Sequence, residues 1–193
     1  MNQGEANLSV LLATDLDRHF PELVLTYQHR LYSFALRQTG SPQDAEDIVQ
    51  EAFVQAYYAL AGYSVERRHL LTLQPWLYKI TLNIFYSRMR QAKLPMVSLD
   101  MQEEGSHATI EDDESTQPAI IAEGNETLRE MAELLVKLPV QYREAVNLYY
   151  FAGLSYREMA DLLNQPMGTI KSNLHRGIRL LRQALMTRKS EAR

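Results

Sequence analysis

The stretch SYREMADLLNQPMGTIKSNLHRG, residues 155–177, decides the fold of the C-terminal part of the chain. Ser155 is followed three residues later by Glu158, the signature of a capping box at the start of a helix. A turn containing Pro166 ends this short helix and leads into a longer one, over roughly residues 167–185. A short capped helix, a tight turn and a longer basic helix are typical of a helix-turn-helix.

The longer helix has an apolar and a basic side. At about 100° per residue, its apolar residues share one stripe that we expect to be buried: Ile170, Leu174, Ile178, Leu181 and Leu185. The other side is basic and rich in hydrogen-bonding groups, as duplex DNA recognition requires. The predicted DNA contacts are Thr169, Lys171, Ser172, Asn173, His175, Arg176 and Arg179. Gly168 is expected to permit close approach of the DNA, and free amides of the first turn to hold a phosphate.

Two more helices precede this pair. TLREMAELLVKL is a helix that Pro139 stops, and VQYREAVNLYYF is a second one that ends near Gly153. Four helices in about sixty residues predict a compact four-helix domain over residues 127–193.

Residues 95–126 have a different composition. They hold nine Asp and Glu residues and no Lys or Arg, so the rest of the chain carries a net charge of +5 although the whole chain is at −4. Such segregation of charge, with few aromatic residues, predicts an acidic flexible linker between two domains.

Residues 1–94 form the first predicted domain. Apolar residues recur at helical spacing from Phe20 to Thr39, and Gly40 ends that helix. The next helix, over residues 41–60, starts with Ser41 as cap and Pro42 at its first position. A loop containing Arg67 and Arg68 leads to a third helix over residues 75–93. Because no segment alternates as a strand would, the fold class is all-α, with two small helical domains.

Two surfaces of the first domain carry functional signals. Opposite the apolar stripe of the 41–60 helix lie Asp47, Gln50, Glu51 and Val54. In the 75–93 helix, Trp76, Leu77, Ile80 and Ile84 are expected in the core. Around that core, bases, aromatics and an amide suit single-stranded nucleic acid: Lys79, Asn83, Phe85, Tyr86, Arg88, Arg90 and Lys93. Alternatively, Phe85 and Tyr86 belong to the core and the basic groups are merely solvated.

Several classes of protein are excluded. The chain has no cysteine, its five histidines are scattered, and it lacks a phosphate-binding loop and a nucleophile elbow. We therefore predict no enzyme, no catalytic residues, no metal and no cofactor. No apolar run is long enough to span a membrane, and the N-terminus lacks the basic region of an export signal, so we expect a cytoplasmic protein without membrane insertion.

The helical segments together resemble a bacterial RNA polymerase sigma factor of the small, two-domain extracytoplasmic-function type. The resemblance covers residues 20–94 and 127–185, in particular SPQDAEDIVQEAFVQAYYAL, PWLYKITLNIFYSRMR and the stretch from KLPVQYREAV to RLLRQAL. It implies that the first domain binds core RNA polymerase, with Asp44, Asp47, Gln50 and Glu51 on the clamp helices of the largest subunit.

The resemblance also implies roles in promoter recognition. Residues 75–93 would melt and capture the minus-ten element, with Asn83 near a flipped base. Residues 167–179 would read the minus-thirty-five element as duplex, at the flap region of polymerase. The acidic linker would run toward the active-site cleft, and an anti-sigma factor would hold the chain inactive.

Two other classes of function remain as alternatives. An autonomous helix-turn-helix regulator would account for residues 127–185 but leaves the acidic face and the basic-aromatic helix of the first domain without a role. A nucleic-acid-processing enzyme would need a metal or nucleophile site, for which the sequence offers no candidate.

Overall fold

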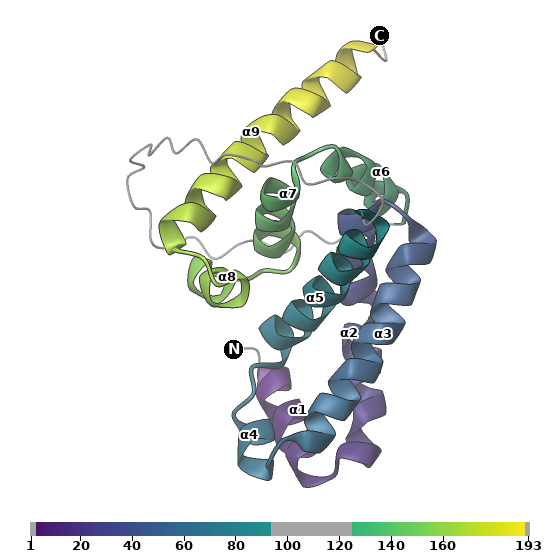
Figure 1. The fold of residues 1–193 in the computed structure, drawn as a ribbon, viewed down its shortest axis with the longest axis vertical. Coiled ribbons are helices and arrows are strands. Elements are labelled where there is room, and N and C mark those ends of the chain that lie inside the picture. Colours follow the sequence, from purple (N-terminus) through teal and green to yellow (C-terminus); the bar gives the residue numbers. More distant parts are fainter. Residues whose placement is uncertain (1–2, 94–124, 192–193) are drawn as a thin grey trace.

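The structure is a computed structural model that describes residues 3–93 and 125–191. All of the regular structure in these two ranges is helical (Figure 1). The first domain consists of α1 (Gln3–Thr14), α2 (Leu16–Thr39), α3 (Pro42–Gly62), α4 (Val65–His69) and α5 (Leu73–Lys93). The second consists of α6 (Asn125–Val136), α7 (Val140–Val146), the π-helical turn η1 (Asn147–Phe151), α8 (Tyr156–Leu163) and α9 (Met167–Glu191). The all-α class and the two-domain organisation are confirmed.

The helix boundaries predicted from capping residues are confirmed. Gly40 has φ 72°, and its amide donates to the Leu36 carbonyl, which closes α2. The Ser41 hydroxyl accepts from the Asp44 amide at 3.2 Å and begins α3, with proline at the first helical position. Ser155 and Glu158 form the complete capping box of α8. These ends depend only on neighbouring residues.

The core of the first domain lies between α2, α3 and α5. Along one side of α2, Leu23, Tyr27, Leu31 and Phe34 are almost fully buried. Facing them are the apolar stripe of α3 and the inner side of α5, where the ring of Tyr78 meets Phe34 edge-on at 4.8 Å. Leu77 and Ile84 are buried as predicted, whereas Trp76 and Ile80 are only partly buried at its edge.

Two helices of the first domain are absent from the sequence prediction. Helix α1 precedes the predicted start of α2, and α2 itself begins at Leu16 because the Asp15 carboxylate accepts from the Arg18 amide at 3.1 Å. Leu8 and Leu12 bury their side chains, which anchors α1. The loop predicted around Arg67 contains the short helix α4. Both α1 and α4 lie at the end of the first domain remote from the second (Figure 1).

The second domain has two further differences from the prediction. The helix predicted over residues 140–151 changes to π-helical geometry at Asn147, where the Ala152 amide donates to the Asn147 carbonyl at 3.0 Å. Helix α9 runs on to Glu191, past the core of the domain. Leu185, predicted to be buried, is therefore 39% exposed, while Ile170 and Leu174 are buried as predicted.

The two domains are packed against each other, an arrangement that was not predicted. Helix α6 packs against α2, and α8 contacts α5 (Figure 1). The second domain starts at Asn125, two residues before the predicted boundary, and the remainder of the predicted acidic linker lies outside the described residues.

Candidate nucleic-acid and protein interfaces

One long face of α3 is open to solvent. The apolar stripe of this helix faces α2 and α5, so its opposite side points outward. Asp44, Asp47 and Gln50 are exposed there, and Glu51 is half-buried. This face, which we call the α3 face, combines charge with an apolar end, since Val54 and Tyr58 continue the same side and are 56% and 71% exposed. Spacings of three, four and seven residues link these side chains, so the helical period would have placed Tyr58 in the set.

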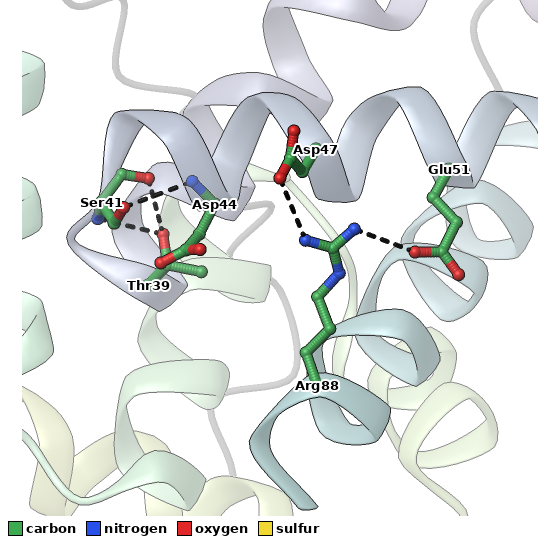
Figure 2. A network of polar contacts seen from close by, with 6 residues as sticks. All are labelled: Thr39, Ser41, Asp44, Asp47, Glu51 and Arg88. Atoms are coloured by element: carbon green, nitrogen blue, oxygen red, sulfur yellow. Dashed lines mark hydrogen bonds and ion pairs between the residues drawn. The ribbon is translucent and has the colours of Figure 1, made fainter. Parts of the chain in front are cut away.

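An arginine of α5 reaches the α3 face. Arg88 lies between Asp47 and Glu51, with Nη1 3.5 Å from the Asp47 carboxylate and Nη2 3.0 Å from the Glu51 carboxylate (Figure 2). All three side chains remain more than one-third exposed. The structure thus joins a residue predicted for the minus-ten site to two residues predicted for polymerase docking.

The other predicted residues of α5 divide into two groups. Lys79, Asn83 and Arg90 are exposed, and spacings of four and seven residues put them on one side of the helix. Arg88 lies well round the helix from this row, next to α3. Phe85 is buried, as the alternative interpretation expected. Lys93 is the last residue of α5, and its side chain lies outside the described residues.

Tyr86 faces the second domain. Its hydroxyl donates to the carboxylate of Glu144 on α7, which is 2% exposed. Burial raises the pKa of Glu144 from 4.5 to about 7, against the opposing effects of the Tyr86 hydrogen bond and of Arg143. Burial and the neighbouring carboxylate raise the pKa of Tyr86 as well, so the phenol keeps its proton. Tyr86 is therefore engaged in the contact between the domains and does not belong to the exposed row of Lys79, Asn83 and Arg90.

A small aromatic cluster lies beside the start of α5. The ring of Tyr63 is 6.2 Å from that of Trp76, and the Arg67 guanidinium stacks over Tyr63 at 3.7 Å. Half-buried rings with a stacked cation resemble the surfaces on which unpaired bases stack. Trp76 was expected in the core, and no role was predicted for Tyr63, because the cluster depends on the fold of the segment around α4.

The helix-turn-helix places its predicted residues at two depths. Thr169, His175 and Arg179 are exposed, whereas the other four are half-buried: Lys171, Ser172, Asn173 and Arg176. Arg176 donates from Nη1 to the Tyr142 hydroxyl at 3.3 Å, and Lys171 lies 5.6 Å from the ring of Tyr156. These contacts orient the two basic side chains beside the exposed side of α9.

Two details of α9 bear on how close DNA can come. A Cβ at Gly168 would meet no atom within 4 Å, so this glycine leaves open space at the start of the helix. The amides of Thr169 and Ile170, which were expected to be free for a phosphate, both donate to the Pro166 carbonyl, at 2.9 and 3.2 Å. That expectation is wrong for these two amides, because the turn at Pro166 uses them to start the helix.

The described ranges contain neither a candidate metal site nor a candidate membrane-spanning helix. Among residues 3–93 and 125–191, no three His, Asp or Glu side chains gather closely enough to hold a metal ion. Within the same ranges, no helix is both long enough and apolar enough to cross a membrane.

Comparison with known proteins matches both domains. Residues 23–94 match the family model of sigma-70 region 2, and residues 128–181 match that of sigma-70 region 4. The chain is 31% identical to the ECF RNA polymerase sigma factor SigW of Bacillus subtilis, over 86% of this chain and 88% of SigW. It is 32% identical to the RNA polymerase sigma-H factor of Pseudomonas aeruginosa, over 91% and 90% of the two chains.

Two solved structures share the fold. The sigma factor RpoE of Bartonella quintana, in complex with the anti-sigma factor NepR, matches with a TM-score of 0.64 and 25% identity, over 86% of this chain and 96% of that one. CnrH, in complex with the cytosolic domain of CnrY, matches with a TM-score of 0.65 and 22% identity, over 95% and 97%.

Proposed function

The chain belongs to the extracytoplasmic-function RNA polymerase sigma factors and directs transcription initiation, and we propose how its surfaces divide that work. The first domain, residues 1–94, docks on core polymerase and recognises the minus-ten element. The second domain, residues 127–193, reads the minus-thirty-five element. An autonomous regulator is not favoured, because the region 2 match and the α3 face would then have no role.

The α3 face is the proposed docking surface for the clamp helices of the largest polymerase subunit. One observation carries this assignment: Asp44, Asp47 and Gln50 are open to solvent along one side of a helix whose opposite side is fixed in the core. The exposed Val54 and Tyr58 add apolar contact area at the end of the same side. Aromatic anchors beside charged groups are typical of protein interfaces.

The exposed row of α5 is the proposed surface for the minus-ten element. Lys79 and Arg90 supply charge for the backbone of a melted strand, and Asn83 supplies an amide for a base. The minus-ten set also holds Tyr86, Arg88 and Lys93. Of these, Tyr86 becomes available only when it leaves Glu144, and Arg88 only when it leaves α3.

The start of α9 is the proposed surface for the minus-thirty-five duplex. Thr169, His175 and Arg179 point outward from the first turns, where a recognition helix meets base edges and phosphates. Lys171, Ser172, Asn173 and Arg176 flank them. Gly168 leaves room for the DNA backbone.

We propose two more features of the biological context. An anti-sigma factor regulates the chain, a proposal supported by the complex of the related RpoE with NepR. The chain acts in the cytoplasm and without catalysis of its own. It works by binding its two partners, core polymerase and promoter DNA.

Co-elution tests the proposed function. The purified chain is mixed with bacterial core RNA polymerase at moderate salt and separated by size exclusion, and the complex is then assayed for promoter-dependent transcripts. We expect a stoichiometric complex that initiates only at promoters carrying both elements. A folded chain that neither co-elutes with cognate core nor changes its transcripts contradicts the proposal.

A further inference from the structure

The contact between the domains is built around one buried amide. Asn147 of η1 is fully buried, and its side chain bonds only to α2 in the contacts seen among the described residues. Its Oδ1 accepts from Arg37 Nε at 2.8 Å, and its Nδ2 donates to the Phe34 carbonyl at 3.0 Å. The Arg37 guanidinium also stacks on the ring of Phe151, 4.2 Å from its centre. A buried side chain of the second domain is thus hydrogen-bonded only to α2 of the first, among the described residues.

Three more polar contacts cross the same interface. Arg143 of α7 donates to the Gln38 carbonyl at the end of α2. Tyr86 of α5 donates to Glu144, and Gln74 of α5 donates to the Ala152 carbonyl. The second domain therefore forms hydrogen bonds with both α2 and α5.

The interface is nevertheless imperfect. Both side-chain polar atoms of Gln38 are buried, and neither has a hydrogen-bond partner within the described residues. Glu144 is buried in an environment that disfavours its charge. Water would solvate the Gln38 amide and the Glu144 carboxylate if the domains separated. A permanent core leaves few buried polar atoms without a partner, as the side-chain atoms of Gln38 are here. The contact also buries apolar side chains of both domains in one hydrophobic cluster, and these polar groups are the part of it that separation of the domains would relieve.

In the closed arrangement, the two proposed DNA-binding helices, α5 and α9, lie too close together to reach both promoter elements at once. Helix α5 packs on α8 and α8 on α9, so at about 10 Å per helix pair α5 and the recognition helix lie roughly 20 Å apart. Elements centred about 25 base pairs apart are separated by roughly 85 Å of duplex, at about 3.4 Å per pair. Fully extended, residues 94–124 would reach about 100 Å, at about 3.3 Å per residue. The covalent connection permits the separation that the closed contact prevents.

We propose that this chain closes on itself, and that the Arg37–Asn147 contact is the latch of a state that docks on polymerase but cannot use a two-element promoter. The proposal rests on the proposed function of the two domains. In the closed state Tyr86 is engaged by Glu144, while the α3 face stays open. Opening releases α5 and lets the second domain reach the distant element.

A reversible staple tests the latch. Gly40 at the end of α2 faces α6, and a Cβ built at Gly40 would lie 3.6 Å from the Cβ of Val136. This separation suits a disulfide, and the chain has no other cysteine. The pair Gly40→Cys with Val136→Cys is oxidised in the free chain, and core binding and transcription are measured before and after reduction. The two single-cysteine variants are the matched controls.

We expect the oxidised chain to co-elute with core polymerase but to lose at least tenfold in initiation at a two-element promoter, with recovery on reduction. An oxidised chain that initiates as well as the reduced one overturns the proposal, as does failure of the disulfide to form in the free chain. If the disulfide forms but the reduced chain neither binds core nor initiates, the proposed function fails while the closed contact stands.

A second variant avoids the strained backbone at Gly40, whose φ is 72°. Asn147→Ala removes both bonds of the latch, and Gln141→Ala, at an exposed position of α7, is its control. Small-angle scattering of the free chain should show a larger radius of gyration for Asn147→Ala only. An unchanged radius in Asn147→Ala, with circular dichroism showing intact helices, argues against the latch.

Discussion

Arg88 of α5 and Glu51 of α3 form an ion pair, with Nη2 3.0 Å from Oε2. Because the same guanidinium also reaches Asp47, one cation serves two carboxylates of the α3 face (Figure 2). Both contacts are partly exposed to water, so each contributes about 1 kcal/mol or less to stability. Cationic side chains of a docking partner could therefore replace Arg88 at little cost, and the pair positions the acidic groups rather than holding the fold.

Reversing the charge of Glu51 should abolish docking on polymerase. Glu51→Lys places an ammonium beside Arg88 and Asp47, in the middle of the α3 face, and the like charge of Arg88 keeps it directed outward. We expect co-elution with core polymerase to be lost while the helical circular dichroism signal is unchanged. The control is Glu46→Lys, which makes the same change on the same helix at another exposed position, about 140° away. Equal binding by both variants would remove the α3 face from the proposal.

Arg88 and Arg90 should behave differently although they are neighbours. Arg90 belongs to the exposed row with Lys79 and Asn83, whereas Arg88 is engaged on α3. Arg90→Gln should weaken binding of a single-stranded minus-ten oligonucleotide by the core complex and reduce its salt dependence, because one backbone contact is lost. Arg88→Gln should change oligonucleotide binding less than Arg90→Gln does. Filter binding over a range of salt concentrations measures both variants. A larger effect of Arg88→Gln than of Arg90→Gln would show that Arg88 contacts the DNA together with the exposed row of α5.

Interactions between residues close in the sequence could be predicted, whereas those between distant residues could not. The capping box of Ser155 with Glu158 and the cap at Ser41 involve residues three apart, so local patterns predict them correctly. The solvent side of α3 follows from the helical period alone. Arg37 and Asn147 are 110 positions apart, and no local pattern links them. The π-helical turn lies at the same Asn147, and the packing of the domains also joins residues far apart in the sequence, so neither was predicted.

The same distinction applies to single residues of the candidate sites. Leu185 fits the apolar stripe of α9 by its period, yet α9 extends beyond the domain core at that point, so its side chain is exposed. Tyr86 fits a nucleic-acid surface by its type, yet the second domain supplies Glu144 as its partner. In each case the pattern identifies the side of the helix correctly, and the neighbouring element decides what covers it.

Two glycines of α9 should separate stability from DNA recognition. A Cβ at Gly177 would lie 2.7 Å from a methyl group of Val146 and 2.9 Å from the Tyr142 carbonyl oxygen, so α7 and α9 are in close contact there. Gly177→Ala should therefore destabilise the chain by about 1–3 kcal/mol, through forced repacking. Gly168→Ala meets no atom within 4 Å and should leave the melting temperature equal or slightly higher, since alanine favours helix.

The second glycine variant should fail in a different assay. If Gly168 lets DNA approach the start of α9, Gly168→Ala should reduce initiation at promoters that need the upstream element while the protein remains fully folded. Thermal melts and transcription from matched promoters, with and without that element, distinguish the two variants. Normal upstream recognition by Gly168→Ala would show that the DNA backbone does not pass close to this residue.

The closed state should be favoured by mild acid, because Glu144 is buried between the domains. Burial raises its pKa from 4.5 to about 7, so between these two values the closed chain binds a proton that the open chain does not. The contribution of Glu144 to closure is complete below about 4.5 and is lost as the pH rises through about 7. In that window the closing equilibrium should change by up to roughly tenfold per pH unit.

Tyr86 and Arg143, the groups that interact with Glu144, set the limits of this effect. The raised pKa of Tyr86 keeps its phenol protonated throughout the window, and burial lowers the pKa of Arg143 from 12.5 without removing the opposing attraction of Glu144. The radius of gyration of the free chain, measured by small-angle scattering, should therefore decrease from pH 8 to pH 6. Glu144→Gln, which resembles the protonated acid, should be compact at both values. A variant that still expands between pH 6 and pH 8 would assign the dependence to another group.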